Sequence, residues 1–277
     1  MKIIDAHQHC WDLAQPGHEW PTPAEAAIHR DATVPDLVAE ADEPRLIATV
    51  LVQSQPNPQD TQWLRAHARA HPLAQAVVGW VDLAAGDAPA QIARLAADPL
   101  LKGVRPMLQS IADTDWLLRA DLAPAIEALI AHGLRLDALV QPRHLPMLAR
   151  FAARYPDLPI VIDHGAKPQP NGPINEWAAD IAALAEAGLW CKLSGLRTEQ
   201  APGRAAGELA PVVRHLIARF GPRLMWGSDW PVLHLAGDRW GDWRQNAAAL
   251  ADATDTHRLF GGAAAAFYDI DLGGTGA

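Results

Sequence analysis

The chain has 277 residues, of which 49% are hydrophobic and 20% are charged, and its formal net charge is −9. This length is close to the ~250 residues of a (β/α)8 barrel, and the apolar fraction suffices for a large core. The acidic balance comes without a basic run or tail, which argues against nucleic acid and against an anionic membrane surface as partners.

The chain has only two cysteines, Cys10 and Cys191, which are too few for a disulfide framework, so both are expected to be reduced and buried. Asp5 interrupts the N-terminus where a secretory signal would need an apolar stretch. The apolar run 46–52 is far too short to span a bilayer. We therefore expect a cytoplasmic protein, and the sequence leaves open whether it forms a homo-oligomer.

Short apolar runs alternate with helical patterns along the chain, which is typical of βαβ units. The expected strands are residues 2–6, 47–52, 76–81, 101–105, 135–140, 160–163, 189–193 and 223–227. The expected helices are residues 36–41, 60–70, 88–97, 121–131, 144–155, 174–187 and 208–220, then 243–251 and 256–268. Asp60 and Asp121 are candidate N-terminal caps.

A polar loop, residues 10–33, follows the first expected strand and contains Trp11 and Trp20. Loops of this length without secondary structure are usually either functional or disordered. The aromatic content favours a functional loop, and we interpret it as a flap over a site.

Eight strand–helix units fill the length without an internal repeat or a linker, which predicts a single TIM barrel, (β/α)8, over residues 1–277 with a frayed tail at 273–277. A doubly wound α/β sheet is the alternative. Its first strand would normally lead into a glycine-rich phosphate-binding turn, whereas this chain has His7-Gln8-His9 there.

Active sites of TIM barrels lie at the C-terminal ends of the strands. Strand alternation predicts that Asp5, His7 and His9 share one face. Asp163 is also a candidate orienter of a histidine, with Arg105 as its ion-pair partner. The polar residues expected at the strand ends are His7, His9, Gln53, Lys102, Arg105, Asp163, His164, Lys192, Ser194, Ser228 and Asp229.

The His7-x-His9 pair, His164 and Asp229 resemble the amidohydrolase superfamily. Six motifs in order narrow the resemblance to its sugar-lactonase branch, and the similarity runs from about residue 2 to residue 268. The motifs are IDAHQHCWD (4–12), VGWVDL (78–83), KGVRP (102–106), IDHGAKP (162–168), CKLSG (191–195) and GSDWP (227–231). The resemblance implies a hydrolase that opens a sugar-acid lactone of the L-fuconolactone type to the aldonic acid.

No Gly-x-Ser-x-Gly elbow occurs, and the sequence places no histidine to activate Cys191, so direct attack by water is favoured over a covalent intermediate. In that reaction Asp229 is the expected general base. The imidazoles of His7, His9 and His164 are expected to stabilise the oxyanion. The expected substrate-binding residues are Arg105, Lys192, Gln53, Trp20 and Trp11.

Dinuclear members of the superfamily carry a carboxylated lysine or a glutamate after strand 4 and a histidine after strand 5. Here Asp137 stands in the strand-5 place and His144 lies well beyond it, so a two-metal site is not expected. A single divalent ion such as zinc on His7, His9 and Asp229 is compatible with tetrahedral ligation, whereas the resemblance implies catalysis without an added metal. Both readings stay open.

Two other functions are weighed against the lactonase prediction. A metal-dependent decarboxylase on the same fold would need a tightly held zinc, and the missing strand-5 histidine argues against it. A catalytically inactive barrel that acts as a sugar-binding or assembly protein is the second, and the intact set of His7, His9, His164 and Asp229 argues against that interpretation.

Overall fold

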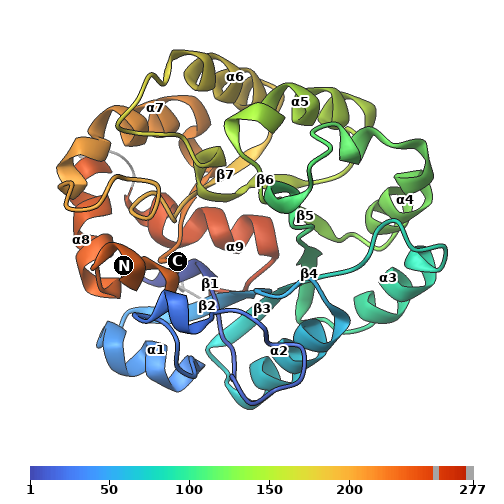
Figure 1. Ribbon diagram of the computed structural model, residues 1–277, viewed down its shortest axis with the longest axis horizontal. Coiled ribbons are helices and arrows are strands. Elements are labelled where there is room, and N and C mark those ends of the chain that lie inside the picture. The colour runs from blue at the N-terminus through green and yellow to red at the C-terminus, as the bar shows by residue number, and fades with distance from the viewer. Residues whose placement is uncertain (252–255, 273–277) are drawn as a thin grey trace.

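The computed structural model describes residues 1–251 and 256–272. Its strands form one parallel sheet in the order β1 to β8, with the helices arranged around it (Figure 1). The strands are β1 Ile3–Gln8, β2 Leu46–Val52, β3 Ala74–Gly79, β4 Leu101–Val104, β5 Arg135–Ala138, β6 Ile160–Ile162, β7 Trp190–Leu193 and β8 Leu224–Trp226. The predicted TIM barrel is therefore confirmed.

The barrel closes where β1 meets the segment after β8. The Asp229 amide donates to the His7 carbonyl at 2.8 Å, and the His9 amide donates to the Trp230 carbonyl at 2.7 Å. These two hydrogen bonds place the HxH pair and Asp229 side by side, although His9 and Asp229 are 220 positions apart in the sequence.

The expected helices match the structure to within a few residues at each end, except that the last, 256–268, contains a π-helical turn at Arg258–Gly262 ahead of α9. Nine α-helices are found in the described residues. They are α1 Val34–Ala41, α2 Pro58–Ala70, α3 Ala88–Ala96, α4 Ala123–Ala131, α5 Leu145–Arg154, α6 Asn175–Glu186, α7 Ala210–Phe220, α8 Trp240–Ala251 and α9 Ala263–Tyr268. The tail 273–277 that was expected to fray lies outside the described residues.

The two predicted helix caps are wrong. The N-cap of α2 is Asn57, whose side chain accepts from the Asp60 amide, and the Asp60 carboxylate instead accepts from the amides of Ser54 and Gln55. Helix α4 begins after Leu122 without a side-chain cap, while Asp121 pairs with Arg119. A short 3-10 turn ahead of α4 displaces Asp121 from the capping position.

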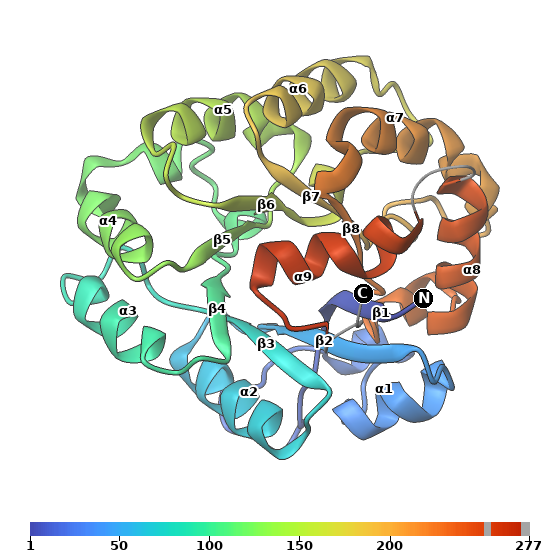
Figure 2. The ribbon, with the colours of Figure 1, turned by 180° about the vertical axis from the view of Figure 1, so that it is seen from behind.

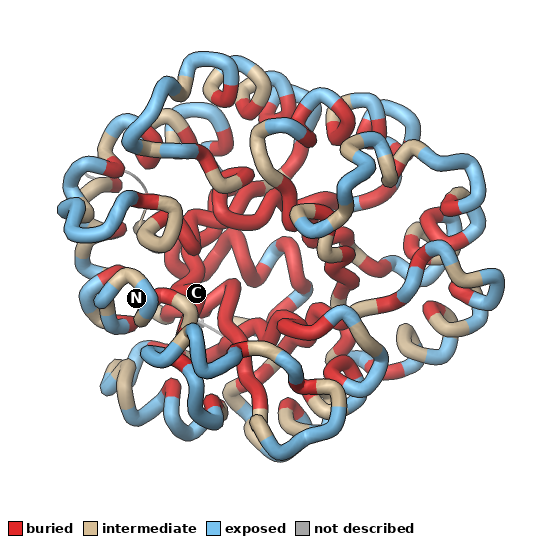
Figure 3. Tube along the Cα trace, viewed as in Figure 1, coloured by how far each residue is buried: buried red, intermediate tan, exposed pale blue. Residues whose placement is uncertain are grey.

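Two apolar layers hold the barrel together, and Figure 3 shows buried residues at its centre with exposed segments around the outside. The outer layer lies between the sheet and the helices. The inner layer fills the inside of the barrel with small and branched side chains, as is typical of TIM barrels. It packs against α9, which lies across one end of the barrel in Figure 2. Inner-layer members include Ile4, Ala6, Val50, Val52, Ala76, Val78, Val161 and Met225.

The long N-terminal loop is ordered over its whole length. Trp11 pairs with Ala32 in a single antiparallel bridge, and a 3-10 turn spans Pro23–Glu25. Thr33 and Asp36 then form a capping box that begins α1. Within the described residues, no helix is both long and apolar enough to cross a membrane.

The seam between β1 and the segment after β8 is packed so closely that a methyl group added at Gly227 should destabilise the protein. A Cβ added at Gly227 would lie 2.7 Å from His7 Cβ and 2.8 Å from the His7 amide nitrogen. We expect Gly227→Ala to lower the free energy of unfolding by about 1–3 kcal/mol, because the backbone must shift to relieve the overlap. Urea denaturation followed by circular dichroism measures this change.

Gly241→Ala in α8 is the matched control, since no described neighbour lies within 4 Å of the added methyl group. It should leave the stability unchanged or raise it by up to about 1 kcal/mol. Similar stability losses for both variants would contradict the close-packed seam.

Candidate active site

A bulge in β1 aims the two histidines at the barrel mouth. Between Asp5 and Gln8 the strand advances three residues while its partner β2 advances two, from Thr49 to Leu51. The extra residue interrupts the alternation of side chains. The prediction that Asp5 shares the face of His7 and His9 is therefore wrong.

Asp5 supports the seam from outside the site. Its carboxylate accepts hydrogen bonds at 2.8 Å from both the Ser228 amide and the Trp240 indole of α8. Burial raises the pKa of Asp5 to about 6, against the lowering effect of these donors. Asp5 thus ties β1 to the loop that carries Asp229.

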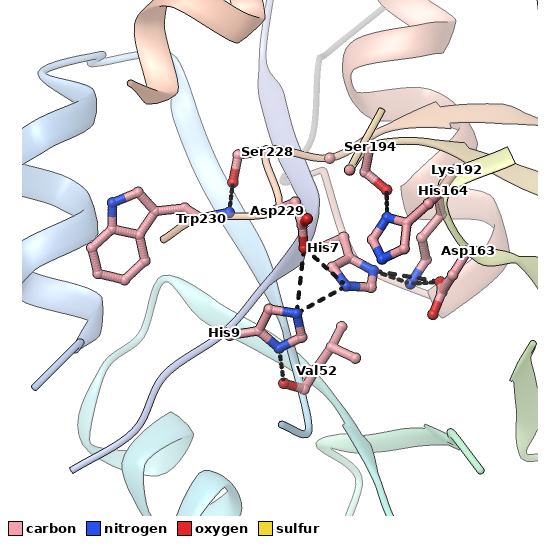
Figure 4. Close-up of polar contacts among 12 residues, drawn as sticks. His7, His9, Val52, Asp163, His164, Lys192, Ser194, Ser228, Asp229 and Trp230 are labelled. Atoms are coloured by element: carbon pink, nitrogen blue, oxygen red, sulfur yellow. Dashed lines mark hydrogen bonds and ion pairs between the residues drawn. The ribbon is translucent and has the colours of Figure 1, made fainter. Parts of the chain in front are cut away.

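His7, His9 and Asp229 converge in the barrel mouth, as Figure 4 shows. The Nε2 atoms of His7 and His9 are 3.2 Å apart, and Asp229 Oδ1 lies 3.7 Å and 3.4 Å from them. His9 Nδ1 is anchored on the Val52 carbonyl at 2.8 Å, which turns its Nε2 toward Asp229. The two imidazole nitrogens and the carboxylate oxygen therefore point toward one common position.

A layer of buried charged side chains contacts His7 on its Nδ1 side. Lys192 Nζ lies 3.0 Å from Asp163 Oδ1 and 3.1 Å from His7 Nδ1 (Figure 4). It also lies 2.5 Å from Asp137 Oδ2, and the side chains of Lys192 and both aspartates are fully buried. Arg105 Nη1 reaches Asp163 Oδ2 at 3.5 Å. Asp163 thus contacts a histidine and Arg105, as predicted, with His7 as the histidine.

The hydroxyl of Tyr268 closes the far side of this layer by donating to Asp137 at 2.7 Å. Tyr268 belongs to α9 at the end of the barrel. The charge layer therefore connects the C-terminal helix to the site.

His164 and Asp229 both sit on strained backbone, with φ of 55° and 59°. Non-glycine residues with positive φ often cluster at functional sites. The ring of His164 bonds Ser194 Oγ through Nδ1 at 2.9 Å, which leaves Nε2 for another partner. It also packs against Gly195, where a Cβ would lie 2.4 Å from Nδ1, so only glycine admits the ring.

The protonation states follow from burial and charge. Burial opposes ionisation of Asp229, but His164, His9 and His7 outweigh it and hold the pKa of Asp229 below its ordinary value of 3.8. Burial lowers the pKa of His164 to about 4, although Asp229 and Asp163 oppose the shift. Burial and the charge of Lys192 lower the pKa of His7 well below 6.5. At neutral pH the site thus holds an ionised Asp229 beside neutral rings of His7 and His164.

A cavity of about 580 Å³ opens above these groups. Of the predicted site residues, Asp229, His9, His164, Arg105 and Trp20 line it. The other lining residues are Glu19, Ser54, Gln55, Pro56, Met107, Gln109, Ser110, Leu139, Lys167, Thr198 and Val232. His7 is fully buried and lies behind His9 and Asp229.

Three residues predicted to bind substrate do not line the cavity. Lys192 is enclosed among carboxylates beneath it, and Gln53 is buried with its amide nitrogen on the Arg105 carbonyl at 2.9 Å. Trp11 packs in the outer core and donates to the Arg30 carbonyl at 2.6 Å. Lys102, also expected at the mouth, instead lies 3.7 Å from Asp269, just beyond α9. The two lysine predictions are corrected by position along the strands. Lys102 is the second residue of β4 and lies at the end of the barrel that α9 covers, whereas Lys192 is the third residue of β7 and is fully buried inside the barrel.

Gln55 and Asn57, which the sequence did not single out, hold residues 12–22 of the N-terminal loop, and only these loop residues are called the flap below. The Gln55 side chain donates to the Trp20 carbonyl at 2.6 Å and accepts from the amides of Glu19 and Trp20 at 3.3 Å. Asn57 donates to the Gly17 carbonyl at 2.8 Å. The only sequence signal was their position just after the second strand.

His18 adds a buried ion pair to this anchor. Its Nε2 lies 3.2 Å from Asp60 Oδ1, and its ring packs edge-on against Trp63. Asp60 is also bonded to the amides of Ser54 and Gln55. The flap and the β2–α2 loop thus form one wall of the cavity.

His7, His9 and Asp229 can hold a metal ion by spacing. Each offers one ligand atom, and the atoms lie within 4.8 Å of one another. Two imidazole nitrogens and one carboxylate oxygen are ligands that Zn²⁺ accepts, with further positions open. The hydrogen bond of His9 to the Val52 carbonyl is the kind of support that metal-binding histidines use. The donor set therefore fits one divalent ion.

A (β/α)8 barrel whose mouth brings an ionised carboxylate, imidazoles and a guanidinium to one cavity is the arrangement of a TIM-barrel enzyme. The amidohydrolase family model matches residues 4–270, and the chain belongs to the amidohydrolase family. The resemblance found in the sequence motifs is thereby confirmed.

Several known proteins are similar over nearly the full length. A Burkholderia ambifaria protein named L-fucono-1,5-lactonase is 46% identical, covering 97% of this chain and 96% of the relative. A Burkholderia multivorans protein of the same name is 33% identical, covering 96% of each. A Burkholderia multivorans amidohydrolase structure with bound zinc has a TM-score of 0.89 at 31% identity, covering 98% of this chain and 100% of that chain.

The flap should loosen when its Gln55 anchor is removed. We expect Gln55→Ala to speed amide hydrogen exchange across residues 12–22 by at least several-fold, because three hydrogen bonds to the flap backbone are lost. Exchange mass spectrometry measures this. Gln91→Ala is the control. It removes a side-chain hydrogen bond between Gln91 of α3 and Asp87, and it should leave the exchange rates of the flap unchanged.

The flap should also respond to pH through His18. Burial disfavours its charged form, but Asp60 outweighs burial and raises the pKa of His18 above 6.5. The stabilisation is complete below the unfolded pKa and is lost as pH rises through the folded one. Flap protection, corrected for intrinsic exchange, should therefore fall on the alkaline side of neutrality. A His18→Gln variant with the same pH dependence would contradict this assignment.

Proposed function

We propose that this protein hydrolyses a sugar-acid lactone to the aldonic acid, with L-fucono-1,5-lactone as the first substrate to test. The observation that carries the proposal is the ionised Asp229 carboxylate in the cavity, with His9, His164 and Arg105 lining the same space. The names of the two Burkholderia relatives support the lactone as the substrate class.

Asp229 is the proposed general base. Lactones are activated esters, so a carboxylate is basic enough to take a proton from water as it adds to the carbonyl carbon. The same carboxyl group then returns the proton to the ring oxygen that leaves. The depressed pKa of Asp229 keeps the carboxylate in the form that this first step requires.

The oxyanion formed by addition needs donors close to Asp229. His164 offers Nε2, because Ser194 engages its Nδ1. Arg105 supplies a fixed positive charge at the cavity wall, and His7 and His9 complete the polar surroundings. Donors of this kind are worth roughly 3–4 kcal/mol each to a transition state. A divalent ion held by His7, His9 and Asp229 would add Lewis-acid polarisation of the carbonyl when bound.

The flap supplies the proposed sugar-binding wall. Trp20 presents an aromatic surface, and Glu19 places a carboxylate beside it. Gln109 and Thr198 line other parts of the cavity with groups that hydrogen-bond hydroxyls. Arg105 and Trp20 thus keep their predicted roles in substrate binding as proposals.

Incubation of the purified protein with a panel of aldonolactones, followed by acid release with a pH indicator, tests the function. We expect release above the spontaneous rate, fastest with a 1,5-lactone. No release above background from any lactone would reject the proposal. A metal-dependent decarboxylase would instead release CO2 from a carboxylic acid and lose that activity after metal removal.

Asp229→Asn tests the base. The change keeps the size of the side chain and removes its basicity, so kcat should fall at least ~100-fold while the variant folds normally. Asp157→Asn, at an exposed position just before β6 and therefore at the end of the barrel away from the cavity, is the matched control and should keep parental turnover. Near-parental turnover of Asp229→Asn on a lactone that the parent hydrolyses would overturn the assignment.

A further inference from the structure

The proton positions on His7 and His9 can be assigned from their hydrogen bonds. His9 Nδ1 faces the Val52 carbonyl at 2.8 Å, and a carbonyl only accepts. His9 therefore carries its proton on Nδ1. In a neutral ring its Nε2 then has a lone pair and no hydrogen.

The contact with Lys192 fixes the proton of His7. A neutral His7 ring whose Nδ1 accepts from an ammonium group carries its proton on Nε2, which lies 3.2 Å from His9 Nε2. With the proton of His7 on Nε2, its Nδ1 has a lone pair, and Lys192 Nζ is a donor 3.1 Å away. One tautomer of each ring thus satisfies the contacts with Val52, His9 and Lys192, and it leaves the His9 Nε2 lone pair 3.4 Å from Asp229 Oδ1.

The competing arrangement fits less well. With its proton on Nδ1, His7 would donate to Asp163 Oδ1 at 3.4 Å and accept from Arg105 Nη1 at 3.5 Å. Both contacts are long, and the 3.2 Å contact to His9 would join two lone pairs. Asp163 Oδ2 already offers an acceptor to Arg105 at 3.5 Å.

Lys192 has no freedom to move away from His7. Its ammonium group is fully buried and held by Asp137 at 2.5 Å and Asp163 at 3.0 Å. We propose that Lys192 is a positioning residue that holds His7 in the tautomer with the proton on Nε2. The resting site therefore presents an N–H donor where a metal ion would need a lone pair.

In this arrangement a metal ion and a proton compete for the same atom, Nε2 of His7. His9 and Asp229 are ready as ligands, whereas His7 must move its proton to Nδ1, facing the Lys192 ammonium. Lys192 thereby weakens the metal site formed by His7, His9 and Asp229. The inference concerns the residues of the proposed function, but its tests use zinc affinity and spectroscopy, so its failure would leave lactone hydrolysis standing.

The first test compares zinc affinity in metal-stripped proteins by competition with a chromophoric chelator. Lys192→Met alone leaves a buried carboxylate uncompensated and risks unfolding, so it is combined with Asp137→Asn. Asp137→Asn alone is the matched control, because Lys192 stays on His7 while the Tyr268 hydroxyl keeps an acceptor. We expect the double variant to bind Zn²⁺ at least ~10-fold more tightly than the control, the scale of outer-ligand effects. Equal or weaker binding would overturn the proposal.

The second test reads the tautomer directly in the metal-free parent protein. Two-bond ¹H–¹⁵N correlation spectra of histidine-labelled protein distinguish a proton on Nε2 from one on Nδ1. The loss of one ring signal in His7→Gln identifies His7 among the 12 histidines. A proton on Nε2 supports the proposal. A proton on Nδ1 overturns it even if zinc binds the double variant more tightly, because removal of the Lys192 charge alone would explain that gain.

Discussion

The structure depends on a positive charge buried inside the barrel. Lys192 is fully enclosed, and a charge in that position is tolerated only with paired carboxylates and hydrogen bonds around it. Asp137 and Asp163 meet this need from β5 and from the end of β6, while His7 accepts from β1. Four parts of the barrel wall are thereby held to one ammonium group, which fixes the position of His7 at the barrel mouth.

Two different parts of the molecule hold the candidate site groups in place and form the wall of the cavity. The β1–β8 seam fixes Asp229 against His7 and His9 through backbone hydrogen bonds and leaves no room for a methyl group at Gly227. The flap is attached through side chains, mainly Gln55. The proposed reacting groups therefore sit on the scaffold, while part of the cavity wall rests on a surface loop, as is common in barrels of this kind.

Much of this organisation was predictable because it is local or periodic. Alternating apolar runs and helical patterns predicted the barrel, and polar residues at strand ends predicted His7, His9, His164, Asp229 and Arg105. Strand alternation alone misplaced Asp5, because a one-residue bulge depends on pairing with β2. Lys192 and Gln53 were expected to touch substrate, since a strand position says which end of the barrel is near but not how deep a side chain lies.

The sequence by itself determined the fold class, the family and the residue types available for chemistry, because hydrophobic periodicity and motif order are properties of the chain alone. Only the tertiary structure decided which charges are enclosed and which face the cavity. Burial of Lys192 requires Asp137 and Asp163, which are 29 or more residues away, and the flap reaches the cavity through Gln55 and Asp60. Such contacts depend on strand register and on distances of a few ångströms, which spacing along a sequence does not encode.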